Sequence, residues 1–279
     1  KEGVARENRI YKITKLPVFE NLELKFHEQL TVIGEKIASG KSTILDAVAI
    51  SSWDFPVAFD GIGNYGIKNE DARLVTNIFG DSLNISSVYP VILSSTGFVN
   101  NQEVHWKRTL TSPNGRCTLA SAKEITAIQM NTKKRIIEGD TTVVLPLVAY
   151  YGTGRLWLQH RAKKEDVLLN SSRTNGYIDC MDSAANDKLI MTGLTRKHQK
   201  IAKEKGTAAF DAVIMAIEKC ISLLIESNDV TVSYNFDNND LDIRIKDDQE
   251  VILPLNRMSD GYKCTISLIT DIAYRMAQL

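Results

Sequence analysis

The sequence has few cysteines and no closely spaced pair of them. The four stand far apart, at Cys117, Cys180, Cys220 and Cys264, and the four histidines are scattered in the same way. Zinc sites and disulfide frameworks are built from paired or closely spaced ligands, so this spacing favours neither of them. We therefore expect free thiols and a cytoplasmic protein.

The chain also lacks an excess of charge and a long apolar run. Its 34 basic and 34 acidic residues cancel, so no whole-chain field draws it to nucleic acid or to an anionic membrane. The run Val143–Tyr151 is interrupted by Pro146 and is far too short to span a bilayer, so no membrane partner is expected. With 279 residues, 43% of them hydrophobic, the chain can bury a large core.

The most informative segment is Leu30–Ile50, which reads LTVIGEKIASGKSTILDAVAI. We expect a buried strand over Leu30–Ile33, a loop that ends at Gly40–Thr43, and a helix over Ser42–Ser52. A strand, a glycine-containing loop and a helix in this order are typical of a phosphate-binding loop, because the loop amides and the positive end of the helix face the phosphates. The segment predicts that the chain binds ATP or GTP.

Individual residues of this loop have expected roles. Lys41 would reach the outer phosphates, and the hydroxyl of Ser42 would coordinate Mg²⁺. The loop departs from the strict pattern G-x-x-x-x-G-K-[ST], since Glu35 stands where that pattern has glycine and Gly34 comes one residue too early. The predicted nucleotide-binding residues are Gly34, Lys36, Ala38, Ser39, Gly40, Lys41, Ser42 and Thr43, with Ser42 as the metal ligand.

Further elements are expected before and after this loop. In the first half, the patterns predict two strands in Ile10–Phe26 around Pro17, short β-like runs over Asn84–Leu93 and Val104–Leu110, a turn at Ser112–Gly115, a helix over Ser121–Arg135 and a second buried strand over Val143–Tyr151. In the second half, they predict a polar helical stretch over Arg161–Gly206, an amphipathic helix over Phe210–Leu224 and a hairpin over Val230–Lys246.

The last segment, Leu255–Leu279, contains a helix-entry signal at Ser259-Asp260-Gly261. A serine or aspartate at this place is expected to accept hydrogen bonds from the first free amides of the helix. The expected packed face of the helix consists of Ile266, Ile269, Ile272, Ala273 and Met276.

Met258–Lys263 reads MSDGYK, which resembles the signature motif of ABC-type ATPases in the LSDGYR form of the RecF/SMC-like branch. Within that branch, the chain is similar to the ATPase subunit of Septu and to its retron-associated relatives in bacterial anti-phage systems. Three segments carry the resemblance: LTVIGEKIASGKSTILDAVAI, LPLVAYYGTGRLW and LNRMSDGYKCTISLITDIAYRMAQL.

The resemblance implies an α/β, ABC-ATPase-like P-loop fold with an antiparallel β subdomain and a helical insertion. The expected divisions are an ATPase lobe over residues 1–160, the insertion over 161–228, and a hairpin with the signature helix over 229–279. The family also places a nucleotide-sensing loop after its central strand, which would be Tyr151–Arg155 here.

The resemblance further implies a head-to-tail dimer that encloses ATP and Mg²⁺. One protomer would supply the Lys41 loop, and the other would supply Ser259, Asp260, Gly261 and Tyr262. The implied partners are a second copy or a higher oligomer, an effector such as an HNH-type nuclease, and nucleic acid, either retron RNA and DNA or target DNA.

One motif of the family has no counterpart in this sequence. An apolar strand ending in Asp-Glu, and a switch histidine, would follow the signature helix. We therefore assign no catalytic residue, and we expect either that the chain is part of a longer ATPase or that nucleotide occupancy itself is the signal. The alternatives are a DNA-repair or chromosome-type ATPase that grips DNA directly, a non-hydrolysing scaffold, and the motor subunit of a transporter.

Overall fold

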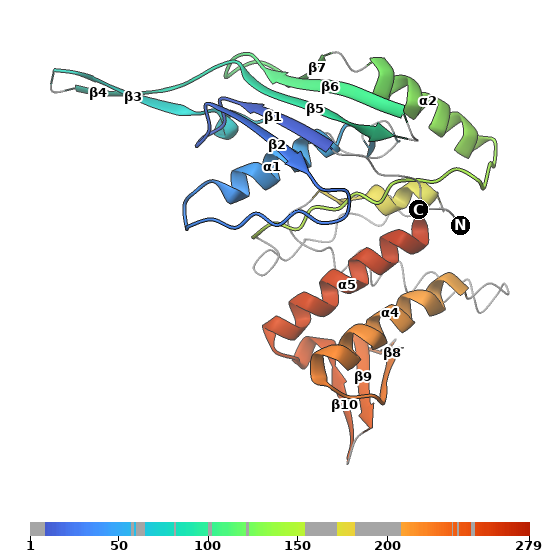
Figure 1. Ribbon diagram of the computed structural model, residues 1–279. Helices are drawn as coiled ribbons and strands as arrows, with labels where there is room; N and C mark the ends of the chain where they lie inside the picture. Colours follow the sequence, from blue (N-terminus) through green and yellow to red (C-terminus); the bar gives the residue numbers. More distant parts are fainter. Residues whose placement is uncertain are drawn as a thin grey trace. The chain divides into compact units, whose positions relative to one another are not determined.

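The computed structural model describes residues 9–56, 59, 65–80, 82–99, 102–120, 123–153, 172–181, 208–235, 237–238, 240–246 and 249–279. The chain forms two compact units, residues 1–143 and 144–279, which we take in turn (Figure 1). Much of the predicted helical insertion, over residues 161–171 and 182–207, lies outside the described residues. The three-part division of the chain stays a prediction.

The first unit contains two sheets and two α-helices among its described residues. Its strands are β1 (Arg9–Thr14), β2 (Asn21–Phe26), β3 (Leu74–Phe79), β4 (Ser82–Ser87), β5 (Val91–Val99), β6 (Gln102–Leu110) and β7 (Thr118–Ala120). Its helices are α1 (Lys41–Ser52), α2 (Lys123–Ile137) and the 3₁₀ turn η2 (Asn69–Asp71). The larger sheet has the order β2-β1-β5-β6-β7 with antiparallel neighbours, and β3 pairs with β4 alone.

The larger sheet buries one face, as antiparallel sheets commonly do. Val91 on β5 pairs directly with Leu110 on β6, so the two side chains share that face. Ala47 and Ile50 of α1 pack in the same cluster as Val91. Farther along β6, Val104 and Trp106 pack against Ile125 of α2. The two helices therefore cover the same side of the sheet.

Several predicted elements of the first unit are confirmed. The two strands around Pro17 are β1 and β2, and the predicted helices correspond to α1 and α2. The turn at Ser112–Gly115 closes with a hydrogen bond of 2.9 Å from the Gly115 amide to the Ser112 carbonyl. Alternation of apolar and polar residues predicted β1 and β2 correctly because one face of each strand is more exposed to solvent than the other.

Two predicted buried strands are wrong. Residues 30–33 form no strand, and Leu30 and Val32 are 72% and 80% exposed. Residues 143–151 form no strand either; Val143 and Leu145 are buried, but Val144 between them is 78% exposed. A buried strand needs neighbours for its backbone hydrogen bonds, and no described strand pairs with either segment.

The second unit combines two long helices with a three-stranded sheet. Its elements are the 3₁₀ turn η5 (Arg173–Tyr177), α4 (Ala208–Ile225), β8 (Val230–Asn235), β9 (Asp240–Lys246), β10 (Glu250–Pro254), the 3₁₀ turn η6 (Leu255–Arg257) and α5 (Asp260–Gln278). The sheet order is β10-β9-β8, with antiparallel neighbours. This confirms the predicted amphipathic helix and hairpin, and adds the third strand β10.

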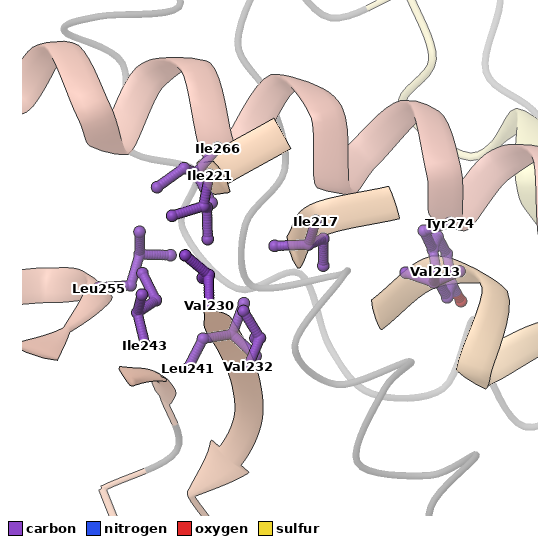
Figure 2. Packing of buried hydrophobic residues seen from close by; sticks show 10 residues of the cluster. All are labelled: Val213, Ile217, Ile221, Val230, Val232, Leu241, Ile243, Leu255, Ile266 and Tyr274. Carbon is purple, nitrogen blue, oxygen red and sulfur yellow. The ribbon is translucent and has the colours of Figure 1, made fainter. Parts of the chain in front are cut away.

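A single apolar cluster holds the second unit together (Figure 2). Ile217 and Ile221 of α4 are fully buried against Leu241 and Ile243 of β9 and Ile266 of α5. The period of the helix and the alternation of the strands both direct their apolar residues into this one cluster. It fixes the long helix α5 on the sheet.

The expected packed face of α5 is only partly correct. Ile266 is fully buried, but Met276 is 65% exposed, and the polar residues Asp271 and Arg275 are buried in its place. A polar side chain can be buried when it has hydrogen-bond partners, so apolar periodicity alone places this face incorrectly. Among the described residues, no helix combines the length and apolar character needed to cross a membrane.

Candidate functional site

The loop before α1 has a backbone shape that needs glycine at one position. Gly40 stands directly before the helix with φ of +89°, in the left-handed region. A Cβ at this residue would lie 2.8 Å from the Cε2 atom of Phe19, which is shorter than a normal contact. Gly34 has nothing within 4 Å of the corresponding Cβ position. Of these two predicted site residues, only Gly40 is sterically required to be glycine.

Lys41 folds back over its own loop. Its Nζ donates hydrogen bonds to the carbonyl oxygens of Glu35 at 2.8 Å and Lys36 at 2.6 Å, and lies 3.4 Å from the Ser39 hydroxyl. The ammonium group is therefore held inside the curve of residues 35–40. A phosphate that enters this curve comes within reach of a positive charge already in position.

A hollow of about 430 Å³ lies at this loop. It is lined by Val18, Ile37, Ala38, Ser39, Gly40, Lys41, Ser42 and Thr43. Six predicted residues, 38 through 43, thus share one concave surface, while Gly34 and Lys36 are outside its lining. Val18 and Ile37 also line the hollow but were not predicted from the sequence. For Val18, the one signal in the sequence was an apolar side chain just after the turn at Pro17.

The start of α1 is open to an anion. No acidic residue stands in its first turn, and no side chain caps it. The first amides of a helix have no partner inside it, and the helix dipole makes this end positive, so an oxyanion is stabilised here. Phe19 and Val18 occupy the space into which a Cβ at Gly40 would point, so the loop keeps this shape only with glycine there.

The hollow also bears on the predicted metal. Ser42 is exposed in the first turn of α1, so its hydroxyl is accessible. Within the described residues, no group of three or more His, Cys, Asp or Glu side chains could hold a metal ion. Mg²⁺ in nucleotide sites commonly takes its ligands from phosphate, water and one or two side chains, and Ser42 fits that arrangement.

Beyond the last turn of α1, a buried ion pair anchors the helix to the sheet. Asp54 is fully buried, and its Oδ1 accepts a hydrogen bond of 2.5 Å from the Nε of Arg108 on β6. Gln129 of α2 donates to the Asp54 carbonyl as well. The other carboxylate oxygen, Oδ2, is buried without a partner. Burial raises the pKa of Asp54 to about 6, although the charge and hydrogen bond of Arg108 act in the opposite direction.

The signature-like motif lies at the exposed start of α5. Ser259 takes the N-cap position with extended backbone angles, but its side chain accepts no cap hydrogen bond, contrary to the sequence prediction. Ser259, Asp260, Gly261 and Tyr262 are all exposed. The carbonyl of Ser259 accepts from the Lys263 amide at 3.0 Å, which begins the helix. The Ser259 hydroxyl is therefore not used in capping and is free to bind a ligand.

A buried polar cluster fixes α5 near its other end. Asp271 and Arg275 are 1% and 2% exposed, and Arg275 Nε donates to Asp271 Oδ2 at 2.8 Å. Arg275 Nη1 also donates to the carbonyls of Gly176 at 2.7 Å and Ile178 at 2.9 Å. This cluster was not predicted, since its one local signal is the i, i+4 spacing of an acid and a base.

Tyr151, in the predicted nucleotide-sensing loop, joins the same cluster. Its hydroxyl donates to Asp271 Oδ2, and burial together with the nearby carboxylate raises the pKa of Tyr151 above its ordinary value. Gly154 and Arg155 of that predicted loop lie outside the described residues. The assignment of the loop to nucleotide sensing stays a prediction.

Comparison with known families agrees with the geometry at Lys41. A family model described as an AAA domain matches residues 12–250, most of the chain and all of the loop at residues 34–43. The match ends before Met258, so it does not include the signature-like motif. A search of curated proteins found no match. The chain belongs to the AAA domain family of P-loop ATPases.

Proposed function

We propose that the chain is the ATP-binding subunit of a bacterial anti-phage defence complex of the Septu or retron type, in which a nucleotide-gated, head-to-tail dimer controls an associated nuclease. The dimer is inferred from two helices whose N-terminal turns are accessible to a ligand. α1 begins at a hollow lined by Lys41, and α5 begins with an exposed, unused Ser259. The defence role is supported by the resemblance of the motif segments alone.

The first of these sites binds the nucleotide. The amides at the start of α1 and the ammonium of Lys41 face the phosphates, and Ser42 supplies a hydroxyl to Mg²⁺. Mg²⁺ held by the Ser42 hydroxyl would neutralise part of the phosphate charge. The Lys41 ammonium exchanges its hydrogen bonds to the loop carbonyls for hydrogen bonds to phosphate, so it has acceptors both with and without nucleotide.

The second site completes the first one in the partner. An exposed serine hydroxyl, a glycine amide and the positive end of a 19-residue helix form a group of donors for the outer phosphate. Two copies of such a chain pair head to tail only while nucleotide lies between them. Nucleotide binding is thereby converted into a change of assembly that an effector can sense.

Mixing two defective variants tests this arrangement. Lys41→Ala removes the phosphate lysine but keeps Ser259, whereas Ser259→Arg blocks the signature position but keeps Lys41. In a head-to-tail pair of one copy of each, one composite site is intact. We expect ATP and Mg²⁺ to increase the association of neither variant alone but to increase that of the equimolar mixture, relative to the same samples without nucleotide, measured by sedimentation velocity with one variant labelled.

Two results would reject the proposal. Wild-type protein that binds ATP without any gain in association would exclude nucleotide-gated pairing, and a mixture whose association ATP raises no more than it raises that of the separate variants would exclude completion in trans. The effector is tested by co-purification from cells that express the neighbouring genes. An associated nuclease whose activity does not change with ATP would contradict the control role.

A non-hydrolysing scaffold is a second candidate that one observation favours. Among the residues that the structure describes, no aspartate or glutamate lines the hollow at Lys41, and hydrolysis needs a group that orients and polarises the attacking water. Single-turnover measurements with radiolabelled ATP separate the two functions. A dimer that forms with ATP and releases no phosphate is a scaffold, and one that turns ATP over is an ATPase.

A further inference from the structure

The hairpin formed by β3 and β4 stands apart from the larger sheet of its unit. Figure 1 shows it extending beyond the end of that sheet, and among the described strands the two pair only with each other. Phe79 pairs with Ser82, so the connecting loop has two residues, and Gly80 has φ of +59°, as tight hairpins of this kind require.

The register of the hairpin separates its residues into an apolar and a polar face. Ile78 pairs with Leu83, and Thr76 pairs with Ile85, so these side chains share one face with Leu74. The opposite face carries the directly paired Asn77 and Asn84. Serines 82 and 86 also lie on that polar face, with Val75 and, at the tip, Phe79.

The apolar face is uncovered. Four large side chains on it are between 57% and 74% exposed: Leu74, Ile78, Leu83 and Ile85. An isolated two-stranded ribbon is at best marginally stable in water, and contiguous exposed apolar side chains on a soluble protein commonly mark an interaction surface. The face needs a partner.

The charges of the segment limit what that partner can be. Residues 74–87 contain no lysine or arginine and a single acidic residue, Asp81. Nucleic acid and anionic lipid are both recognised through basic side chains, so neither fits this face. A protein surface fits, and a second copy of the same hairpin fits best, because its face is equally apolar and its one charge, Asp81, belongs to the connecting loop and not to the paired strands.

We propose that the chain forms a two-fold symmetric dimer in which the apolar faces of two β3–β4 hairpins pack against each other. In such a pair each hairpin presents the same patch to the other, so Ile78 and Leu83 of one copy cover those of its partner. The interface is separate from the nucleotide sites and forms without ATP. It gives the assembly a second contact in addition to the proposed nucleotide-gated one.

A matched pair of variants tests this interface in the absence of nucleotide. Ile78→Lys places a charge on the apolar face, and Asn77→Lys places the same charge on the neighbouring residue of the polar face. By sedimentation equilibrium, we expect wild type and Asn77→Lys to dimerise alike, and Ile78→Lys to weaken the dimer at least about a hundredfold. Leu83→Lys should repeat the effect of Ile78→Lys.

Three results would overturn the proposal. Wild-type protein that is monomeric at about 100 µM, well above typical dimer constants, would show that no second copy covers the face. A dimer that survives both Ile78→Lys and Leu83→Lys would place its interface elsewhere. Equal dissociation by Asn77→Lys would show that charge on the hairpin, and not the apolar face, decides assembly. Because ATP is absent, none of these results depends on the proposed function.

Discussion

The hydroxyl of Tyr151 donates a hydrogen bond of 2.5 Å to Oδ2 of Asp271, across 120 residues of sequence. The same oxygen accepts from Arg275 Nε, and the other carboxylate oxygen is buried without a partner in the part of the chain that the structure describes. A buried carboxylate with one oxygen unsatisfied depends strongly on the donors that remain. The helix that carries the signature-like motif is therefore fixed to the segment around Tyr151.

Tyr151→Phe removes only that hydroxyl. Hydrogen bonds to charged groups contribute more than neutral ones, so we expect the free energy of unfolding to fall by about 1.5–3 kcal/mol. Urea unfolding followed by circular dichroism measures the loss. Tyr177→Phe is the matched control, since the Tyr177 hydroxyl donates at 2.7 Å to a neutral carbonyl, that of Pro146. Its expected loss is about 1 kcal/mol. An equal or larger loss in Tyr177→Phe would contradict a special role for Asp271.

Gly40→Ala should damage the phosphate loop. The added Cβ meets the ring of Phe19, and the residue must keep a positive φ that alanine adopts only at a cost of about 1–2 kcal/mol. We expect ATP affinity to fall at least about tenfold, corresponding to 1.4 kcal/mol. Gly34→Ala is the control, because its Cβ meets nothing within 4 Å. If fluorescence titration gives the two variants the same affinity, the close fit at Gly40 does not shape the site.

Stability should depend on pH through Asp54. Its pKa is raised from 3.8 to about 6 by burial, so the folded state binds a proton more tightly than the unfolded state does. The resulting stabilisation is fully present below pH 3.8 and is lost as the pH rises through about 6. Between about pH 5 and about pH 7.5, wild type should lose about 1 kcal/mol more than Asp54→Asn does. Identical pH dependence of urea unfolding in the two proteins would show that Asp54 does not titrate in this range.

Ser259→Ala should separate capping from ligand binding. The Ser259 side chain makes no cap hydrogen bond, so its loss should cost less than about 0.5 kcal/mol, against about 1 kcal/mol for a bonded cap. ATP-driven pairing should nevertheless weaken, because the hydroxyl is expected at the partner's phosphate. A large loss of stability with unchanged pairing would give Ser259 the structural role that the sequence first predicted.

Much of the fold could be predicted from local patterns. The alternation in residues 230–246 and the apolar spacing of Val213, Ile217 and Ile221 predicted a hairpin and a helix that the structure confirms. Each of these elements buries one face in a single apolar cluster, so its periodicity follows directly from its packing. The helix that follows the Lys41 loop was predicted for the same reason, because its apolar face packs on the sheet.

The differences between the predicted and the observed structure depend on contacts between residues that are far apart in the sequence. Leu30 and Val32 have the composition of a buried strand, but no described strand pairs with them. The run predicted over Asn84–Leu93 spans the end of β4 and the start of β5, but β3 and its pairing with β4 were missed because the apolar residues of this hairpin are exposed and mark no core. Asp271 was missed because its burial depends on Tyr151, which is far away in the sequence.

ATP binding tests the central claim most directly. Isothermal titration of the wild-type chain with ATP and Mg²⁺ should show one site per chain. Lys41→Ala should abolish that site, whereas Lys25→Ala, which removes an exposed lysine of β2, should leave it unchanged. Wild-type protein that takes up no nucleotide, or a Lys41→Ala variant that binds as tightly as wild type, would contradict the account.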